Sequence, residues 1–134
     1  AEACLRNDDA SEAKTYLEKV RDRAREGASI LPAFPGYKVP DYRDGYALRQ
    51  LQDNAEDLEL AIRHERRVEL AMESHRWYDL CRWGIAKEVM DAYAQTETDL
   101  AKANMGTFVK GKHELLPIPD EEVRLGSLEQ NFGW

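Results

Sequence analysis

Three glutamates in the middle of the chain stand four residues apart, a spacing that could serve metal binding or acid/base catalysis. They are Glu65, Glu69 and Glu73. His64-Glu65 begins like a zinc-binding His-Glu-x-x-His helix, but Val68 occupies the place of the second histidine. Glu73 and His75 are two residues apart and therefore point to different sides of a helix, so a Glu-x-x-His metal motif is missing as well. The sequence predicts no metal site and no cofactor.

A structural role explains the same glutamates better. On a helical wheel, Glu65 and Glu69 fall inside the apolar stripe that contains Ile62. A carboxylate there is strongly destabilising unless a positive charge pairs with it. The planar guanidinium of arginine suits this role because it can donate two hydrogen bonds to one carboxylate. We therefore expect at least one of the two glutamates to be largely buried and within about 4 Å of an arginine. The residues assigned to this structural network are Glu65, Arg66, Glu69, Arg76, Trp77, Asp79, Arg82 and Trp83, with Arg21 as a further arginine nearby.

Aromatic residues offer a second kind of chemistry, the stacking of rings on ligands. Trp77 and Trp83 stand near the end of a predicted helix, where a tryptophan typically closes a core, and we expect at least one of them to pack on the N-terminal hairpin. Residues 28–53 hold further aromatics in a loop interrupted by prolines, and a loop of this length is typically functional or disordered. The candidate ligand-binding residues are Tyr37, Tyr42 and Tyr46. The alternative is that these tyrosines merely cover the helices.

The elements that must position these residues are mainly helices. Residues 1–26 predict a helical hairpin, with Ser11 capping its second helix and Gly27 ending it. Asn54 or Asp57 could cap a long helix that runs to about residue 81, and Gly84 separates it from a second helix over about 85–93. The chain is helix-compatible from its first residue, which suggests a fragment of something longer.

The last third of the chain predicts an irregular region. Phe108-Val109 and Leu115-Leu116 flank a turn-prone Lys110-Gly111-Lys112 and could form one short β-hairpin. Asp120 could cap a short turn that extends through Val123. The predicted fold class is mainly α: a helical, tetratricopeptide-like hairpin and a long helix, followed by an irregular C-terminal region.

Length and charge narrow the class of protein. The chain has 134 residues, enough for one domain, and carries a net charge of −7. An acidic surface argues against nucleic acid as a partner. No apolar run is long enough to span a bilayer. The two cysteines, Cys4 and Cys81, follow no metal-site spacing and stand among apolar helical neighbours, so we expect reduced core residues.

Residues 61–84 carry a resemblance to a known family. The segment AIRHERRVELAMESHRWYDLCRWG resembles the signature helix of the SusD/RagB family, I-x-x-E-R-R-x-E-L-x-x-E-x-x-R-W-x-D-L-x-R-W-G. Residues 1–24 are similar to the family's last tetratricopeptide-like hairpin, and the segments LLPIP (115–119) and QNFGW (130–134) resemble its closing L-P-I-P…Q-N-P-G-Y. The resemblance identifies residues 1–134 as a C-terminal SusD/RagB-like domain, with residues 28–53 and about 92–107 outside the matched motifs.

The resemblance implies a binding function rather than an enzyme. SusD-like proteins are helix-rich lipoproteins on the outer face of the bacterial outer membrane. They capture glycans, or peptides in some branches, for a TonB-dependent β-barrel transporter. The family's ligand contacts lie mostly N-terminal to such a segment, so this one is expected to be mainly structural, with membrane attachment only through a lipid anchor outside it.

Two other classes stay open from the residues alone. The chain could be a free-standing helical scaffold that binds a partner helix, or an enzyme that uses Glu65 and Glu69. Changing both glutamates to glutamine would separate these cases, since a network role affects folding and a catalytic role affects turnover alone.

Overall fold

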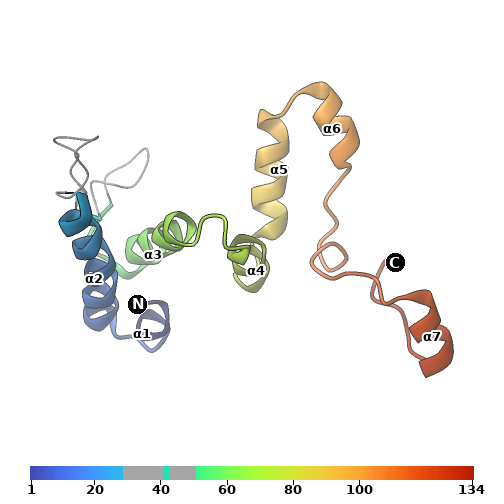
Figure 1. Ribbon diagram of the computed structural model, residues 1–134, viewed down its shortest axis with the longest axis horizontal. Coiled ribbons are helices and arrows are strands. Elements are labelled where there is room, and N and C mark those ends of the chain that lie inside the picture. The colour runs from blue at the N-terminus through green and yellow to red at the C-terminus, as the bar shows by residue number, and fades with distance from the viewer. Residues whose placement is uncertain (29–40, 43–50) are drawn as a thin grey trace. The chain divides into compact units, whose positions relative to one another are not determined.

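The computed structural model describes residues 1–28, 41–42 and 51–134 (Figure 1). Within these ranges the chain is helical with no strand, which confirms the mainly α prediction. It divides into two compact units, Ala1–Ala71 and Met72–Trp134. The expectation of one domain stays a prediction, and the units are described one at a time.

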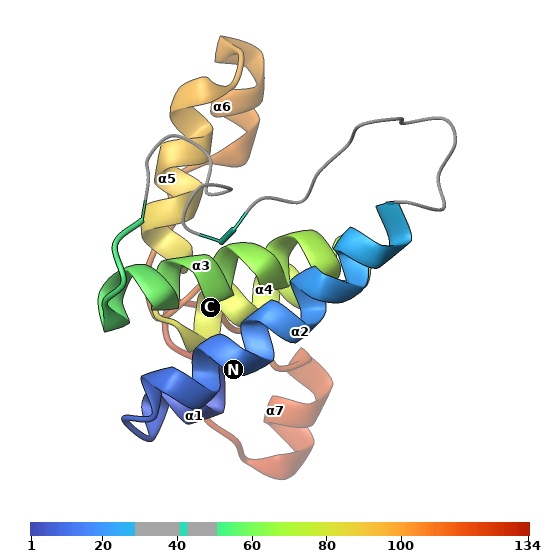
Figure 2. The same cartoon turned by 90° about the vertical axis from the view of Figure 1, so that its left-hand side faces the viewer.

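The first unit begins with the predicted hairpin. Helix α1 (Glu2–Arg6) packs against α2 (Ala10–Ala28), as Figure 2 shows. The cap of α2 is Asp9, whose Oδ1 accepts from the backbone N–H of Glu12 at 2.9 Å. The prediction that Ser11 caps this helix is wrong, because Ser11 already lies inside its first turn. The helix also includes Gly27, so Gly27 does not end it.

Helix α3 (Ala55–Glu69) forms the third element of this unit. Of the two predicted caps, Asn54 and Asp57, it is Asn54 that caps the helix, by accepting from the backbone N–H of Asp57 at 2.9 Å. Helices α2 and α3 enclose a small core between them (Figure 2). The buried residues of this core are Ala13, Leu17, Tyr42, Leu51, Leu58, Ala61 and Ile62.

The prediction of one helix from about residue 54 to 81 is wrong. Helix α3 ends at Glu69, and α4 (His75–Arg82) begins after a turn in which Met72 and Ser74 have φ of 68° and 62°. Left-handed backbone costs a non-glycine residue roughly 1–2 kcal/mol. No Gly or Pro marks the break in the sequence. Local propensity therefore does not account for the break.

The second unit continues from α4 through Gly84, whose φ of +70° makes the predicted break possible. Helix α5 (Ala86–Thr96) is slightly longer than predicted. Helix α6 (Asp99–Met105), capped by Thr98, was not predicted. Helix α7 (Asp120–Gly126) follows Pro119 as N-cap, so the short turn expected there extends beyond Val123 and its cap is not Asp120.

The prediction of a β-hairpin over residues 108–116 is wrong. The segment is a tight turn, in which the N–H groups of Lys112 and His113 donate to the carbonyl of Val109 at 3.2 and 3.1 Å. The backbone N–H of Val109 in turn donates to Nδ1 of His113 at 2.9 Å. Leu116 beyond the turn is 84% exposed. Val109 and Leu115 are 42% and 52% exposed as well, so these residues lack a buried apolar face that would hold them as strands.

Candidate functional site

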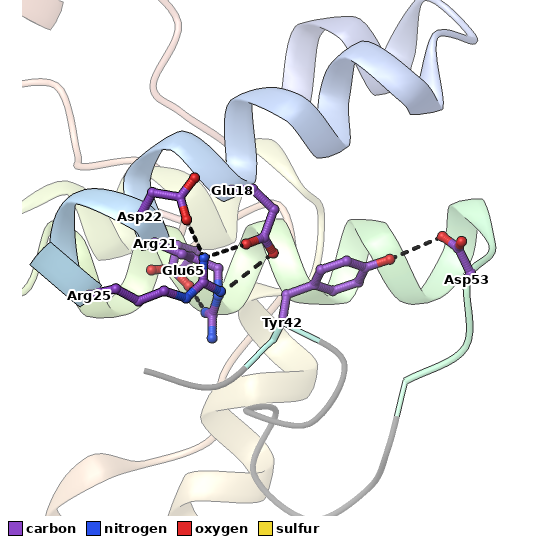
Figure 3. Close-up of polar contacts among 7 residues, drawn as sticks. All are labelled: Glu18, Arg21, Asp22, Arg25, Tyr42, Asp53 and Glu65. Atoms are coloured by element: carbon purple, nitrogen blue, oxygen red, sulfur yellow. Dashed lines mark hydrogen bonds and ion pairs between the residues drawn. The ribbon is translucent and has the colours of Figure 1, made fainter. Parts of the chain in front are cut away.

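The buried charge pair predicted from the sequence is present in the first unit. Arg21 of α2 and Glu65 of α3 have side chains that are 8% and 13% exposed, and Arg21 Nη1 lies 2.5 Å from Glu65 Oε2 (Figure 3). The expectation of a largely buried glutamate beside an arginine is confirmed. Each charge has lost most of its water, so each depends on the other for stabilisation.

Further charges of α2 extend this pair along the helix (Figure 3). Arg25 Nη1 donates to Glu18 at 2.8 Å and to Asp22 at 2.5 Å, and Arg21 Nε lies 4.0 Å from Glu18. The hydrogen bond with Glu18 is the main cause that raises the pKa of Arg25. The roles of Glu18, Asp22 and Arg25 were not predicted from the sequence, although positions 18, 21, 22 and 25 share one helix face by spacing alone.

A second set of ion pairs joins the hairpin to α3. Glu69 pairs with Arg23 of α2, and Arg66 lies 3.9 Å from Glu2 of α1. These pairs are more exposed than the Arg21–Glu65 pair, with Arg23 at 71%. Exposed pairs contribute little individually, so their role is to align the helices rather than to stabilise the core.

The remaining residues of the predicted network lie in the second unit. Asp79 is 4% exposed and accepts from Arg82 Nε at 2.9 Å, while the guanidinium of Arg82 lies 4.9 Å from the centre of the Trp83 ring. Trp77 packs edge to face on Phe108, with ring centres 6.1 Å apart. Arg76 is half-buried on α4. The predicted network is thus divided between the two units. The packing of Trp77 or Trp83 on the first hairpin stays a prediction.

An open groove of about 420 Å³ lies over α2 and α3 in the first unit. Its apolar lining comes from Tyr16, Leu17, Val20, Ile62 and Leu70, with Ala1 beside them. Its charged lining comes from Arg23, Glu65, Arg66 and Glu69. The glutamates that could have served catalysis therefore line a groove in which each is paired with an arginine. This arrangement suits the binding of an amphipathic segment better than proton transfer.

Tyr42 lies in the core rather than at a ligand-binding surface. Its side chain is 2% exposed, and its hydroxyl donates to Asp53 Oδ1 at 3.1 Å (Figure 3). Lys14 Nζ lies 3.1 Å from the same carboxylate. The expectation that Tyr42 contacts ligand stays a prediction, and its burial favours the alternative that it covers the helices. Tyr37 and Tyr46 lie outside the described residues.

The described ranges contain no group of three or more His, Cys, Asp and Glu side chains placed to hold a metal ion. Cys4 and Cys81 are both free and half-buried, and burial is the main cause that raises the pKa of each thiol. Both cysteines are therefore mainly protonated thiols at neutral pH, poorly suited to nucleophilic chemistry. None of the described helices is long and apolar enough to cross a membrane.

Comparison with known proteins adds family information to this geometry. The SusD family model matches residues 1–134. The SusD-like protein P2 of Formosa agariphila is 31% identical over 123 residues, which cover 91% of this chain and 20% of that protein. The SusD-like protein P25 of the same bacterium is 42% identical over 65 residues, or 48% of this chain and 11% of that protein. The chain thus spans a fifth or less of these relatives. No solved structure matches it.

Proposed function

The chain belongs to the SusD family, and we propose that the protein containing it captures glycans, or other nutrient oligomers, at the cell surface for import. The import partner in this proposal is a TonB-dependent β-barrel transporter of the outer membrane. The protein would lie on the extracellular face of that membrane, attached through a lipid anchor outside this segment. It would carry out no catalysis.

One observation carries the proposal: the family match extends over the whole chain, and the matched relatives are SusD-like proteins. The geometry is compatible with it. The carboxylates Glu65 and Glu69 are held by arginines, and the thiols of Cys4 and Cys81 have raised pKa values. These groups are poorly placed to react, whereas binding requires only a stable scaffold.

We further propose that this segment is mainly structural within the larger protein. The support is the series of ion pairs that joins α1, α2 and α3, with the buried Arg21–Glu65 pair among them. Such a series fixes the register of three helices against one another. A rigid C-terminal scaffold of this kind would position binding surfaces elsewhere in the protein.

The test is a binding assay on the full-length protein with a panel of oligosaccharides, followed by isolation of its membrane complex. We expect saturable binding of at least one glycan without product formation, and co-isolation of a TonB-dependent transporter. Hydrolysis of the glycan by the purified protein, or failure to bind any member of a broad glycan and peptide panel, would contradict the proposal.

A role for the loop tyrosines is tested in the same assay. The double variant Tyr37→Ala/Tyr46→Ala should weaken glycan binding if this loop contacts ligand. Tyr42→Phe is the matched control, because it retains the buried ring and loses only the hydroxyl that reaches Asp53. Unchanged affinity of the double variant, with folding intact, would exclude the loop from the site.

The groove over α2 and α3 favours one second candidate, a scaffold that binds a partner helix. Val20→Glu would place a charge on the apolar lining of this groove, whereas Lys19→Glu changes an exposed neighbour on the same helix. The scaffold function is favoured if only the Val20 variant loses a stable protein partner. Glycan binding, whether present or absent, should then be the same in the wild-type protein and in both variants.

A further inference from the structure

Residues 130–134, here named the clasp, lie against residues 111–118, although neither segment is a strand. The sequence of the clasp, QNFGW, is one of the motifs that carry the family resemblance, and the binding proposal gives it no role. Ile118 stands between Pro117 and Pro119, which have no backbone N–H groups. This stretch therefore cannot form a regular ladder of backbone hydrogen bonds, and side chains of the clasp take the place of a partner strand.

Two amide side chains make these hydrogen bonds. Gln130 bonds both backbone groups of Ile118: its Oε1 accepts from the N–H at 2.8 Å, and its Nε2 donates to the carbonyl at 2.8 Å. The same Oε1 accepts from the N–H of Asn131 at 2.8 Å, and Asn131 Nδ2 donates to the carbonyl of Leu116 at 2.7 Å. Because a side-chain amide both donates and accepts, these two residues pair with the backbone where the prolines exclude a ladder.

The other three residues of the clasp lie against the start of the same segment. The Phe132 ring comes within 3.6 Å of the place where a Cβ on Gly111 would lie. Gly133 has φ of +79°, and the side chain of Lys112 lies 3.0 Å from the place of its missing Cβ, so a larger residue would be strained there and would crowd Lys112. Trp134 Nε1 donates to the carbonyl of Lys112 at 3.1 Å. Every residue of the clasp thus has a partner in this segment.

A row of aromatic rings connects the clasp with a pocket of about 260 Å³ that lies within the unit Met72–Trp134. The ring centres of Trp134 and His113 are 6.0 Å apart, and those of His113 and Phe108 are 5.3 Å apart. Phe108 in turn lies 6.1 Å from Trp77 of α4. All three pairs are edge to face, an arrangement that is favourable at these distances. Trp77, Phe108 and His113 line the pocket, so the clasp contacts one of its walls directly through His113.

The turn that carries Phe108 and His113 is also held from α5. Lys87 Nζ donates to the carbonyl of Phe108 at 3.2 Å and to Asp91 Oδ2 at 2.6 Å. Within the turn, the backbone N–H of Val109 donates to Nδ1 of His113 at 2.9 Å. The turn is thus anchored to α5 on one side and to the clasp on the other. A single hydrogen bond makes only a modest net contribution, so neither anchor by itself fixes the turn.

We propose that the clasp is a conformational device that sets the shape of this pocket, so that the clasp and the pocket wall become ordered together and loosen together. The turn over residues 108–115 couples them, because it carries two rings of the pocket and the carbonyls that the clasp binds. The unit has little else to hold this turn, since its buried apolar side chains are Leu80 and Ala86. The inference goes beyond the proposed function and is the same for any ligand.

The test uses the full-length protein without ligand. Gln130→Glu keeps the shape of the side chain but sets a carboxylate oxygen against the carbonyl of Ile118 in place of the N–H donor. We expect amide hydrogen exchange over residues 108–118, measured by mass spectrometry, to accelerate about tenfold. Glu129→Gln is the matched control, because it makes the reverse change at an exposed neighbour, and it should leave exchange unchanged.

The pocket is followed by NMR of ¹³C-labelled methionine methyl groups in the same variants. Met90 and Met105 line the pocket, and Met72, which is fully exposed and outside the lining, is the internal reference. We expect Gln130→Glu to shift the signals of Met90 and Met105 and to leave Met72 unchanged. A clasp with only a local role would move none of the three signals.

Coupling is tested from the opposite side with Lys87→Met, which removes the anchor to α5 and keeps the aliphatic chain. Exchange at the amides of residues 130–134 should then accelerate, although no bond of the clasp has been removed. Asp91→Asn is the control, since it removes the charge partner of Lys87 and keeps the bond to Phe108. The double variant Gln130→Glu/Lys87→Met should accelerate exchange by less than the product of its two single effects.

Two results overturn the inference. One is faster exchange after Gln130→Glu that is confined to residues 111–118, with the signals of Met90 and Met105 unmoved. The other is a double variant whose effect equals the product of the single effects, because the two anchors would then act independently. If Gln130→Glu unfolds α4 and α5 by circular dichroism, Asn131→Asp, which removes one donor to Leu116, repeats the comparison. No ligand is present in any arm, so failure here leaves the proposed function standing.

Discussion

The Arg21–Glu65 pair gives the sharpest test of how this scaffold is held together. Arg21→Met removes the guanidinium and keeps most of the aliphatic chain, so Glu65 would remain as a buried carboxylate without its closest partner. Removing one partner of a buried pair costs about 3–5 kcal/mol. The side chains are 8% and 13% exposed, so water screens the pair weakly. Partial entry of water at Glu65 places the expected loss of stability near the lower end, at about 3 kcal/mol.

The assay is hydrogen exchange of the backbone amides of α2 and α3, followed by mass spectrometry of the native protein. A loss of about 3 kcal/mol accelerates exchange through local unfolding by about a hundredfold. The Arg23–Glu69 pair joins the same two helices but has Arg23 71% exposed, so Arg23→Met should cost less than about 1 kcal/mol. The double variant Arg21→Met/Glu65→Leu should recover most of the loss, since an apolar pair can replace a buried ion pair.

If Arg21→Met accelerates exchange no more than Arg23→Met does, the buried pair does not stabilise the two helices as proposed. A double variant as unstable as the sum of its two single variants would also exclude this role, because the two side chains would then act independently. Circular dichroism of each variant confirms that the helices are still formed before exchange is compared.

Three further predictions concern single residues. Tyr42→Phe should lower the free energy of unfolding by about 1 kcal/mol, because it loses the hydrogen bond to Asp53. Tyr42→Ala should lower it by about 3–5 kcal/mol, because it also removes the buried ring. Both values are measured by urea denaturation, and similar losses for the two variants would contradict a core role. Asn54→Ala should lower the free energy of unfolding by about 1 kcal/mol, because α3 loses its cap. Asn54→Gly should lower it by only about a few tenths of a kcal/mol, measured in the same way. Equal losses for the two variants would exclude side-chain capping. Because burial raises the pKa of Cys81, its thiolate fraction at pH 8 is lower than in an unfolded peptide. Its alkylation by iodoacetamide, followed by mass spectrometry, should therefore be slower in the folded protein and accelerate as pH rises, and a rate equal to that of the peptide would contradict this.

The sequence determined the features that follow from local chemistry. The apolar periodicity of residues 1–26 predicts the helical hairpin, and Asn54 marks the start of α3 because its side chain can accept from an N–H three residues on. Because Glu65 stands inside an apolar stripe, its carboxylate needs a cationic partner in the fold, and the sequence predicts an arginine. The motifs of residues 61–84 likewise identify the family before any coordinates, because they depend on residue order alone.

The sequence could not choose among partners far apart along the chain. Several arginines were available to Glu65, and only the packing of α2 on α3 selects Arg21, which is 44 positions away. The same packing places Tyr42 in the core, where a loop position alone had suggested a binding residue. The charges Glu18, Asp22 and Arg25 share a helix face by spacing, but their link to Glu65 through Arg21 appears only once the two helices meet.

The turn between α3 and α4 shows the limit of local reasoning most clearly. The sequence from Leu70 to Ser74 contains neither Gly nor Pro, and its residues favour a continued helix over the left-handed conformations of Met72 and Ser74. The break lies at the boundary between the two compact units, Ala1–Ala71 and Met72–Trp134. Helix propensity depends only on residues that are near in sequence, and it marks no break here. The position of the break is therefore seen only in the tertiary structure.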